Sequence, residues 1–167
     1  TLDKHPLFQK AYLDAVTDVY GRRFLEERLD GVSIQAAAML DADNFKCIND
    51  SCGHPIGDVA LRRIARVIRA HLDANDLVIR YGGDEFVILF PEITPEQFQQ
   101  TLEKIREDIS RTPIEAGSPH LLSVSIGGVY GVPNLTDAIR QADQLMYLAK
   151  QQKNQVQYRI IPGGREK

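Results

Sequence analysis

The stretch RYGGDEF at residues 80–86 decides the centre of this fold. Two strand-like runs, 77–81 and 85–90, flank its pair of glycines, and this pattern predicts a β-hairpin with a tight turn. Glycines at the turn also let a ligand approach the backbone. Because neighbouring residues on a strand point to opposite faces, we expect Asp84 and Glu85 to do different jobs. The hairpin pattern by itself favours the alternative to a ligand site, which is a solvated turn with acidic residues at its tip.

A second polar stretch, DADNFK at 41–46, follows the apolar run 33–40, which predicts a buried strand. Asp41 at the end of that strand is well placed for a ligand. Mg²⁺ takes one or two carboxylates together with phosphate oxygens. An EF-hand loop does not fit, because Phe45 occupies its fifth position and Lys46 stands where the glycine is needed. A polar loop without a metal is the alternative from these residues alone.

The third stretch, NDSCGHPIGD at 49–58, could read a nucleobase. Asn49 offers a donor and acceptors, and an ionised Asp58 only accepts, so the pair could recognise a guanine edge. The alternative for Asp58 is a carboxylate at a helix N-terminus, which is favourable by itself. We interpret His54 as a loop-packing residue. The density of Asp, Asn and Gly over 41–58 predicts a loop or broken turn.

Hydrophobic periodicity outward from these motifs predicts the other elements. We expect helices at 5–29 with a break near Gly21, at 58–72, after Thr94 with Phe98, Leu102, Ile105 and Ile109 buried, and at 134–151, and strands at 121–130 and 155–161. The resulting order is helix, strand, helix, hairpin, helix, strand, helix, strand. It predicts one mixed sheet covered by helices.

Composition limits the class of protein. The chain has 167 residues, a net charge of −3, 43% hydrophobic residues and no apolar run of membrane-spanning length. The two cysteines, Cys47 and Cys52, form no metal-binding spacing and favour a reducing, cytoplasmic setting. An acidic chain is a poor general nucleic-acid binder, so we interpret the four arginines within 58–72 as a solvated helix face rather than a nucleic-acid surface.

These motifs together resemble the GGDEF family, the diguanylate cyclases. RYGGDEF at 80–86 is similar to the motif that names the family, and residues 41–58 match its other long motif, D-x-D-x-F-K-x-x-N-D-x-x-G-H-x-x-G-D, at every fixed position. SVSIG at 123–127 resembles a family strand, and 142–150 resembles its last helix. The similarity runs from about residue 14 to residue 154.

The resemblance implies an α/β (α+β) domain similar to the palm of nucleotidyl cyclases, with a mixed, mainly antiparallel central sheet, flanking helices and GGDEF on a β-hairpin. It implies a leading linker helix at 1–13, the cyclase domain at 14–161 and a tail at 162–167. The family condenses two GTP into cyclic di-GMP and two pyrophosphates in an antiparallel homodimer. An upstream sensor domain, and a parent protein that could be anchored to a membrane, are further expectations.

The resemblance also assigns roles to residues. Two Mg²⁺ ions, replaceable by Mn²⁺, would be held by Asp41, Asp84 and the carbonyl of Ala42. Glu85, with Asp84, would be catalytic. Contacts to the substrate GTP are expected from Asn44, Phe45, Lys46, Asn49, Asp58, Gly82, Gly83, Lys150 and Lys153, of which Asn49 and Asp58 would read guanine and the lysines would bind phosphates.

The chain departs from the family at three places. The inhibitory R-x-x-D site appears as Asp73 to Asp76, with the aspartate Asp76 but not the arginine, so we expect weak product inhibition. After Lys150 the chain is one residue shorter than the family's A-K-x-x-G-R-N and lacks its glycine. In the N-terminal motif, Asp18 and Gly21 are substitutions. The altered tail supports one alternative, a sensor module that binds GTP or cyclic di-GMP without turnover.

Overall fold

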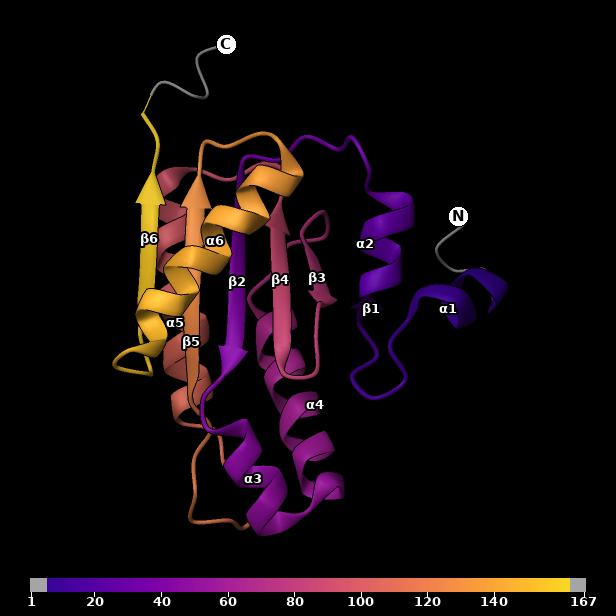
Figure 1. Ribbon diagram of the computed structural model, residues 1–167, viewed down its shortest axis with the longest axis vertical. Coiled ribbons are helices and arrows are strands. Elements are labelled where there is room, and N and C mark those ends of the chain that lie inside the picture. The colour runs from indigo at the N-terminus through magenta and orange to yellow at the C-terminus, as the bar shows by residue number, and fades with distance from the viewer. Residues whose placement is uncertain (1–5, 163–167) are drawn as a thin grey trace.

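The computed structural model describes residues 6–162 (Figure 1). Within them one sheet contains the strands β1 (Tyr20–Gly21), β2 (Ala36–Ala42), β3 (Leu77–Arg80), β4 (Glu85–Phe90), β5 (Val124–Tyr130) and β6 (Val156–Ile160). The helices are α1 (Pro6–Tyr12), α2 (Arg22–Arg28), α3 (Phe45–Cys52), α4 (His54–Ala70), α5 (Pro95–Ser110) and α6 (Leu135–Lys150). Part of the predicted leading helix and most of the predicted tail lie outside the described residues.

The sheet is mixed, with the strand order β1-β3-β4-β2-β5-β6. Its centre is antiparallel, because β2 pairs antiparallel with both β4 and β5, while β1 and β6 join the edges in parallel. This register places Asp41 opposite Glu85 on one side and Ser125 on the other. The predicted fold class and hairpin are confirmed.

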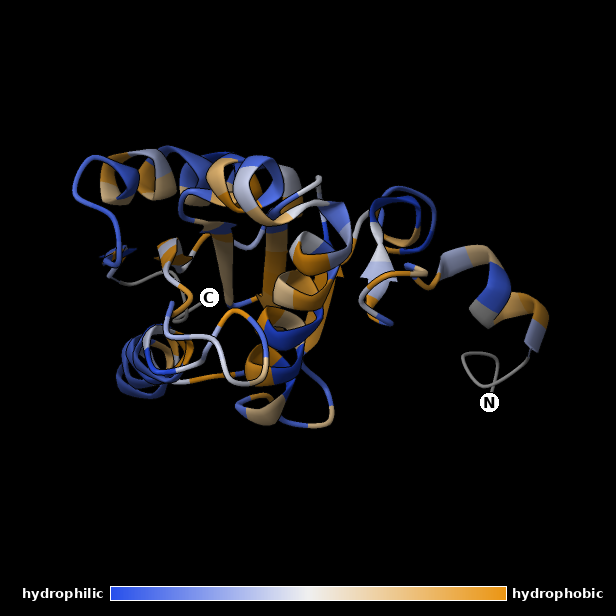
Figure 2. Ribbon diagram, turned by 90° about the horizontal axis from the view of Figure 1, so that it is seen from below, coloured by the Kyte–Doolittle hydropathy of each residue, from blue (hydrophilic) through white to orange (hydrophobic). Residues whose placement is uncertain are grey.

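Helices cover both faces of the sheet, which gives two apolar cores. In Figure 1, α6 crosses in front of the central strands and α5 lies behind them. Residues of α4 and α5 pack against Leu40 and Phe86 on one face, and residues of α2 and α6 pack against Met39 and Val87 on the other. Figure 2 shows the apolar strands enclosed between helices whose outer faces are polar.

The predicted loop over 41–58 is wrong. Asn44, in the left-handed conformation with φ 58°, is the N-cap residue just before α3, and Gly53 with φ 90° separates α3 from α4. Phe45 and Ile48 turn inward and pack against the core. Lys46, Asp50 and Ser51 are exposed on the outer face of this short amphipathic helix, a pattern that the count of Asp, Asn and Gly conceals.

The predicted helix at 5–29 is interrupted over a longer stretch than the expected break near Gly21. Helix α1 ends at Tyr12, and the chain turns before β1 and α2. The turn closes because the Asp14 carboxylate accepts hydrogen bonds from the backbone N–H of Thr17 at 2.9 Å and from its hydroxyl at 2.7 Å. Local side-chain hydrogen bonds of this kind compete with helix formation. The other predicted helices and strands are present, with ends that differ by a few residues.

Candidate active site

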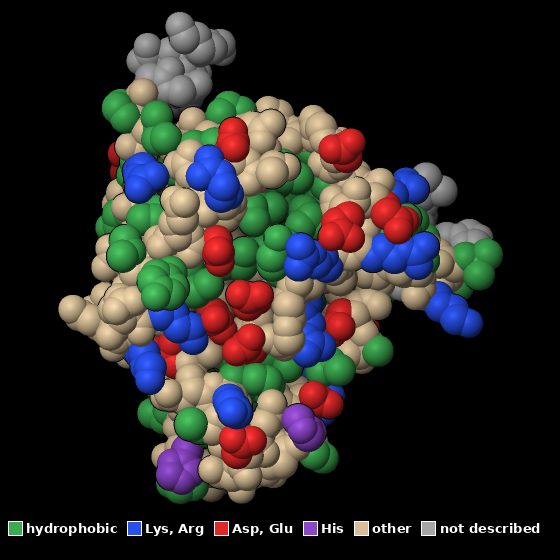
Figure 3. Space-filling model, viewed as in Figure 1, with side chains coloured by type: hydrophobic (Ala, Val, Ile, Leu, Met, Phe, Trp, Pro, Cys, Tyr) green, Lys and Arg blue, Asp and Glu red, His purple; other side chains and the backbone are tan. Residues whose placement is uncertain are grey.

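The carboxylates of three residues lie close together where β2 ends and β4 begins: Asp41, Asp84 and Glu85. Asp41 and Glu85 are register partners on these adjacent strands, and the backbone N–H of Ala42 donates to the carbonyl of Asp84 at 3.1 Å. The sheet thus brings together the DADNFK and GGDEF stretches, which are about forty residues apart in sequence. Figure 3 shows acidic side chains gathered on this face beside an apolar hollow between α2 and α6.

The hairpin turn is held by Arg80, whose structural role the sequence did not reveal. Its guanidinium donates to the carbonyl of Gly83 at 2.7 and 3.2 Å and to both Asp14 carboxylate oxygens at 3.1 and 3.2 Å. This links the turn before β1 to the hairpin tip. The link fixes the position of Asp84 relative to the sheet.

The environment of Asp41 favours a proton or a cation. Burial, followed by the charge of Asp84, raises the pKa of Asp41 to about 8, and the Lys150 ammonium opposes this shift. Burial and the charges of Asp84 and Asp143 also raise the pKa of Glu85. Carboxylates whose pKa values are raised by one another are characteristic of functional sites.

The donors at this point fit a divalent cation. Asp41 Oδ1 is buried and accepts no hydrogen bond. Among residues 6–162 no group of three His, Cys, Asp or Glu side chains is arranged to hold a metal by itself. Two carboxylates and the Ala42 carbonyl nevertheless form an all-oxygen set of the kind that Mg²⁺ takes together with phosphate oxygens. The unpartnered oxygen of Asp41 is the observation that supports the fit.

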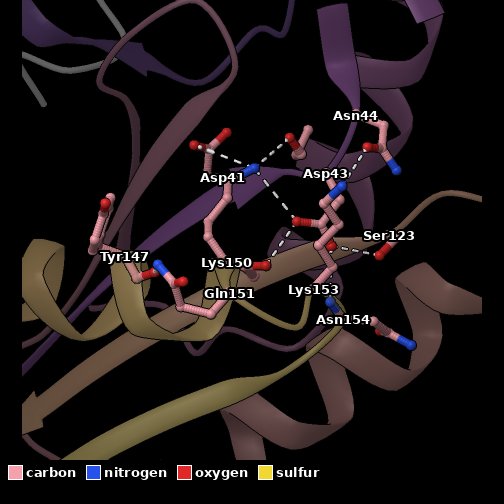
Figure 4. Close-up of polar contacts among 11 residues, drawn as sticks. Asp41, Asp43, Asn44, Ser123, Tyr147, Lys150, Gln151, Lys153 and Asn154 are labelled. Atoms are coloured by element: carbon pink, nitrogen blue, oxygen red, sulfur yellow. Dashed lines mark hydrogen bonds and ion pairs between the residues drawn. The ribbon is translucent and has the colours of Figure 1, made fainter. Parts of the chain in front are cut away.

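Lys150 at the end of α6 and Lys153 in the turn after it both reach the end of β2 (Figure 4). Lys150 Nζ donates to the Ala42 carbonyl at 3.0 Å and lies 3.5 Å from Asp41 Oδ2. Lys153 Nζ donates to Asn44 Oδ1 at 2.8 Å. The structure therefore brings both predicted phosphate-binding lysines to the end of β2. Lys46, by contrast, is exposed on α3.

The two predicted guanine-reading residues lie on adjacent helices. Asn49 is on α3 and Asp58 is in α4, and both are half-buried. A Cβ on Gly57 would overlap Asn49 Oδ1, so the glycine makes room for the Asn49 side chain between the helices. The structure places these residues at the same end of the sheet as Asp41, because α3 begins three residues after β2 ends.

Asp43 has no role that the sequence motifs predicted. Its carboxyl group is fully buried and lies one residue beyond Ala42. It accepts hydrogen bonds from Ser123 and Ser125 on the β5 side of the sheet. The alternation of Asp41 and Asp43 in the motif was the available signal, since a strand end with period 2 places the two carboxylates on the same face.

A pocket of about 1090 Å³ lies between α2 and α6 next to Glu85. Met39 and Ile139 contribute apolar surface, and Asp143 contributes a second carboxylate. Arg22 lies over the Tyr81 ring, 4.1 Å from its centroid, at one wall. The pocket shares Glu85 with the carboxylate cluster but lacks Asn49, so the predicted guanine-reading residues lie elsewhere.

The residues that correspond to the family's inhibitory site form a closed acidic turn. Asp76 Oδ2 accepts from the backbone N–H of Asp73 at 2.9 Å. The pKa of Asp76 is raised above its ordinary value, mainly because the carboxyl is partly buried. The hydrogen bond from the Asp73 backbone opposes this rise, and the Asp73 charge adds to it. Two carboxylates in one turn leave no cation here to pair with a phosphate.

The fold, with the GGDEF motif on the hairpin between β3 and β4, is that of a GGDEF domain. Residues 11–156 match the family described as the diguanylate cyclase GGDEF domain, and the chain belongs to that family. The structure of the coiled coil and GGDEF domain of DgcB from Caulobacter crescentus, in complex with c-di-GMP, matches with a TM-score of 0.81 and 28% identity, over 92% of this chain and 88% of that one.

Curated relatives carry two kinds of name. The diguanylate cyclase DosC of Escherichia coli is 34% identical over 158 residues, which cover 87% of this chain and 34% of that protein. The cyclic di-GMP phosphodiesterase PdeB of Shewanella oneidensis is 34% identical over 155 residues, or 88% of this chain and 18% of that protein. The chain thus spans about a third or less of the length of these two relatives. Among residues 6–162, every helix is too short or too polar to cross a membrane.

Proposed function

We propose that this chain is a diguanylate cyclase domain that condenses two GTP into cyclic di-GMP and two pyrophosphates. The observation that carries the proposal is the buried, unpartnered oxygen of Asp41, with Asp84 and Glu85 beside it and Lys150 opposite. A catalyst of nucleotidyl transfer needs this combination, because it must neutralise phosphate charge and align the reacting oxygens.

The reaction is two identical nucleotidyl transfers. In each, a 3′-hydroxyl oxygen of one GTP forms a bond to the α-phosphorus of the other, the bond from that phosphorus to the bridging oxygen breaks, and pyrophosphate leaves. The hydroxyl loses its proton in the same step. Asp41, Asp84 and the Ala42 carbonyl would hold Mg²⁺, which when bound would neutralise phosphate charge and make the hydroxyl more acidic.

Glu85 is proposed to take part in this proton transfer. Its raised pKa brings its titration closer to neutral pH, where a general base is most effective. It lies opposite Asp41 in the sheet, so it reaches the same space as the metal ligands. Its side chain faces the pocket between α2 and α6, from which an attacking hydroxyl of a second nucleotide could approach.

The remaining residues would hold the substrate. Asn49 and Asp58 would read the guanine edge, and Lys46, Lys150 and Lys153 would pair with the phosphates. The backbone at Asn44, Phe45, Gly82 and Gly83 would line the phosphates. One chain supplies one such set, so a reaction between two GTP molecules requires two chains facing each other as an antiparallel homodimer.

The direct test is a product assay with purified protein, GTP and Mg²⁺, read by chromatography and mass spectrometry. We expect cyclic di-GMP and pyrophosphate from the parent chain, and at least a hundredfold less from Asp84→Asn, because one metal ligand is lost. Asp137→Asn is the matched control, since it removes an exposed carboxylate whose surface ion pair with Arg140 contributes little. It should keep full activity.

The same assay separates the cyclase from a sensor module. The second candidate is a domain that binds nucleotide without turnover, because a similar segment occurs in PdeB, a protein named as a phosphodiesterase and not as a cyclase. Metal-dependent GTP binding with no cyclic di-GMP at high protein concentration would contradict the cyclase proposal and support the sensor. Adding EDTA should abolish turnover in the cyclase.

A further inference from the structure

The turn that follows α6 adopts an uncommon backbone conformation. Lys153 and Asn154 have φ values of 65° and 51°, both in the left-handed region. Residues with a Cβ rarely adopt this conformation, and two in succession are rarer still, so surrounding contacts must hold them there. This is also the segment in which the chain is one residue shorter than its family pattern.

A hydrogen bond to Asp43 fixes the turn. The backbone N–H of Asn154 donates to Asp43 Oδ2 at 2.9 Å. Two further bonds support it: the N–H of Lys153 donates to the Ala149 carbonyl at 2.9 Å, and Asn154 Oδ1 accepts from Arg106 at 3.1 Å. The Asp43 bond connects the turn to the end of β2.

The same carboxylate also contacts Lys150. Asp43 Oδ1 lies 3.4 Å from Lys150 Nζ and accepts from the Ser125 hydroxyl at 2.7 Å, while Oδ2 accepts from the Ser123 hydroxyl (Figure 4). The Asp43 side chain has no exposed surface. Both of its oxygens are therefore occupied by the protein, and Asp43 cannot touch a substrate.

We infer that Asp43 is a positioning residue that fixes the spacing of Lys150 and Lys153 for the β- and γ-phosphates of GTP. It contacts Lys150 directly, and it orders the turn from which Lys153 reaches Asn44 Oδ1. The inference rests on the proposed function, because it takes GTP as the ligand. Asp43 would affect GTP binding only through the two lysines, without touching the nucleotide.

The chemistry of Asp43→Asn follows from these contacts. The amide keeps the shape of the side chain but replaces one acceptor oxygen with an NH₂ group that must face donors. If the NH₂ group replaces Oδ2, the Asn154 N–H and the Ser123 hydroxyl lose their acceptor; if it replaces Oδ1, the Ser125 hydroxyl does. In both cases Lys150 loses its counter-charge. The lysines should then lose their fixed spacing, while Asn49 and Asp58, on α3 and α4, keep theirs.

The test compares two ligands by isothermal titration calorimetry with Mg²⁺. One is a GTP analogue with a methylene bridge between its α- and β-phosphates, which cannot react. The other is GMP, which has the guanine and one phosphate only. We expect Asp43→Asn to weaken analogue binding about tenfold and GMP binding less than twofold. Glu107→Gln, which neutralises an exposed acid on α5, should change neither.

A double-mutant cycle gives a second readout. In a chain that already carries Lys150→Ala and Lys153→Ala, adding Asp43→Asn should cause no further loss of analogue affinity, because Asp43 acts only through these side chains. If Asp43→Asn does not fold, Ser123→Ala tests the same network, with an expected threefold loss for the analogue and none for GMP.

The outcomes are distinguishable. Equal loss of both ligands would mean that Asp43 only supports the fold, and unchanged affinity for the analogue would mean that it positions nothing; either result overturns the inference and leaves the proposed function intact. A further loss in the lysine-free background also overturns it. A parent chain that binds neither ligand overturns the proposed function, and the inference with it.

Discussion

At the scale of single residues, the site keeps acidic groups together at a cost to stability. Asp41 has a folded-state pKa of about 8 against an ordinary value of 3.8. Between about pH 4 and pH 8 the folded chain therefore keeps a proton on Asp41 that the unfolded chain has already released. Stability of the metal-free protein should fall as pH rises through this window, because the folded state binds more protons.

A substitution that removes an acidic neighbour of Asp41 should therefore reduce activity and increase the free energy of unfolding. Asp84→Asn removes the charge next to Asp41, so the free energy of unfolding of the metal-free chain at pH 8 should increase by about 1 kcal/mol, a value that allows for solvent screening. The gain should be smaller at pH 5. Urea denaturation in EDTA at both pH values measures it.

Asp137→Asn serves again as the control, since its pairing with Arg140 is a surface contact. It should leave stability within about 0.5 kcal/mol of the parent chain. A lower stability of Asp84→Asn at pH 8 would show that Asp84 supports the fold rather than straining it.

At the scale of elements, the position of α6 is set by its close approach to β5. A Cβ on Gly127 would overlap the backbone N of Met146 and the carbonyl oxygen of Ala142. Backbone atoms of a helix cannot move aside as a flexible side chain can. The glycine therefore fixes the distance at which α6, and with it Lys150, lies over the sheet.

Gly127→Ala is expected to destabilise the chain by about 2–3 kcal/mol, because α6 must move away from β5 to admit the methyl group. Affinity for the unreactive GTP analogue should fall as well. Thermal and urea denaturation measure the first effect. Gly83→Ala is a matched control for stability, because a Cβ there would meet nothing within 4 Å. Equal stability of the two variants would contradict this account of helix packing.

At the scale of the whole molecule, the proposed reaction needs two chains. Each domain would offer one set of the proposed metal, guanine and phosphate contacts. Specific activity should therefore rise with protein concentration until the dimer saturates, by mass action. Product formation per chain over a hundredfold dilution series, with sedimentation to follow the dimer, measures this. A constant specific activity while the chain sediments as a monomer would contradict a shared active site.

The motifs determined much of this protein before any tertiary structure. The two glycines at 82–83 and the strands on either side predicted the hairpin that the structure contains. That Asp84 and Glu85 differ in role stays a prediction. Periodic apolar residues predicted α5 and α6 because those helices bury one face. The sequence pattern was sufficient to predict an element when the residues of that element alone show its periodicity.

Only the tertiary structure decided how these elements meet. The pairing of Asp41 with Glu85, the approach of Lys150 from α6 and the burial of Asp43 all join residues that are far apart in the chain. The sequence could not predict α3, because its inward-facing residues are few and are spread among polar ones. Strand register, desolvation and charge coupling depend on what lies nearby in space, and the linear order of residues does not specify that.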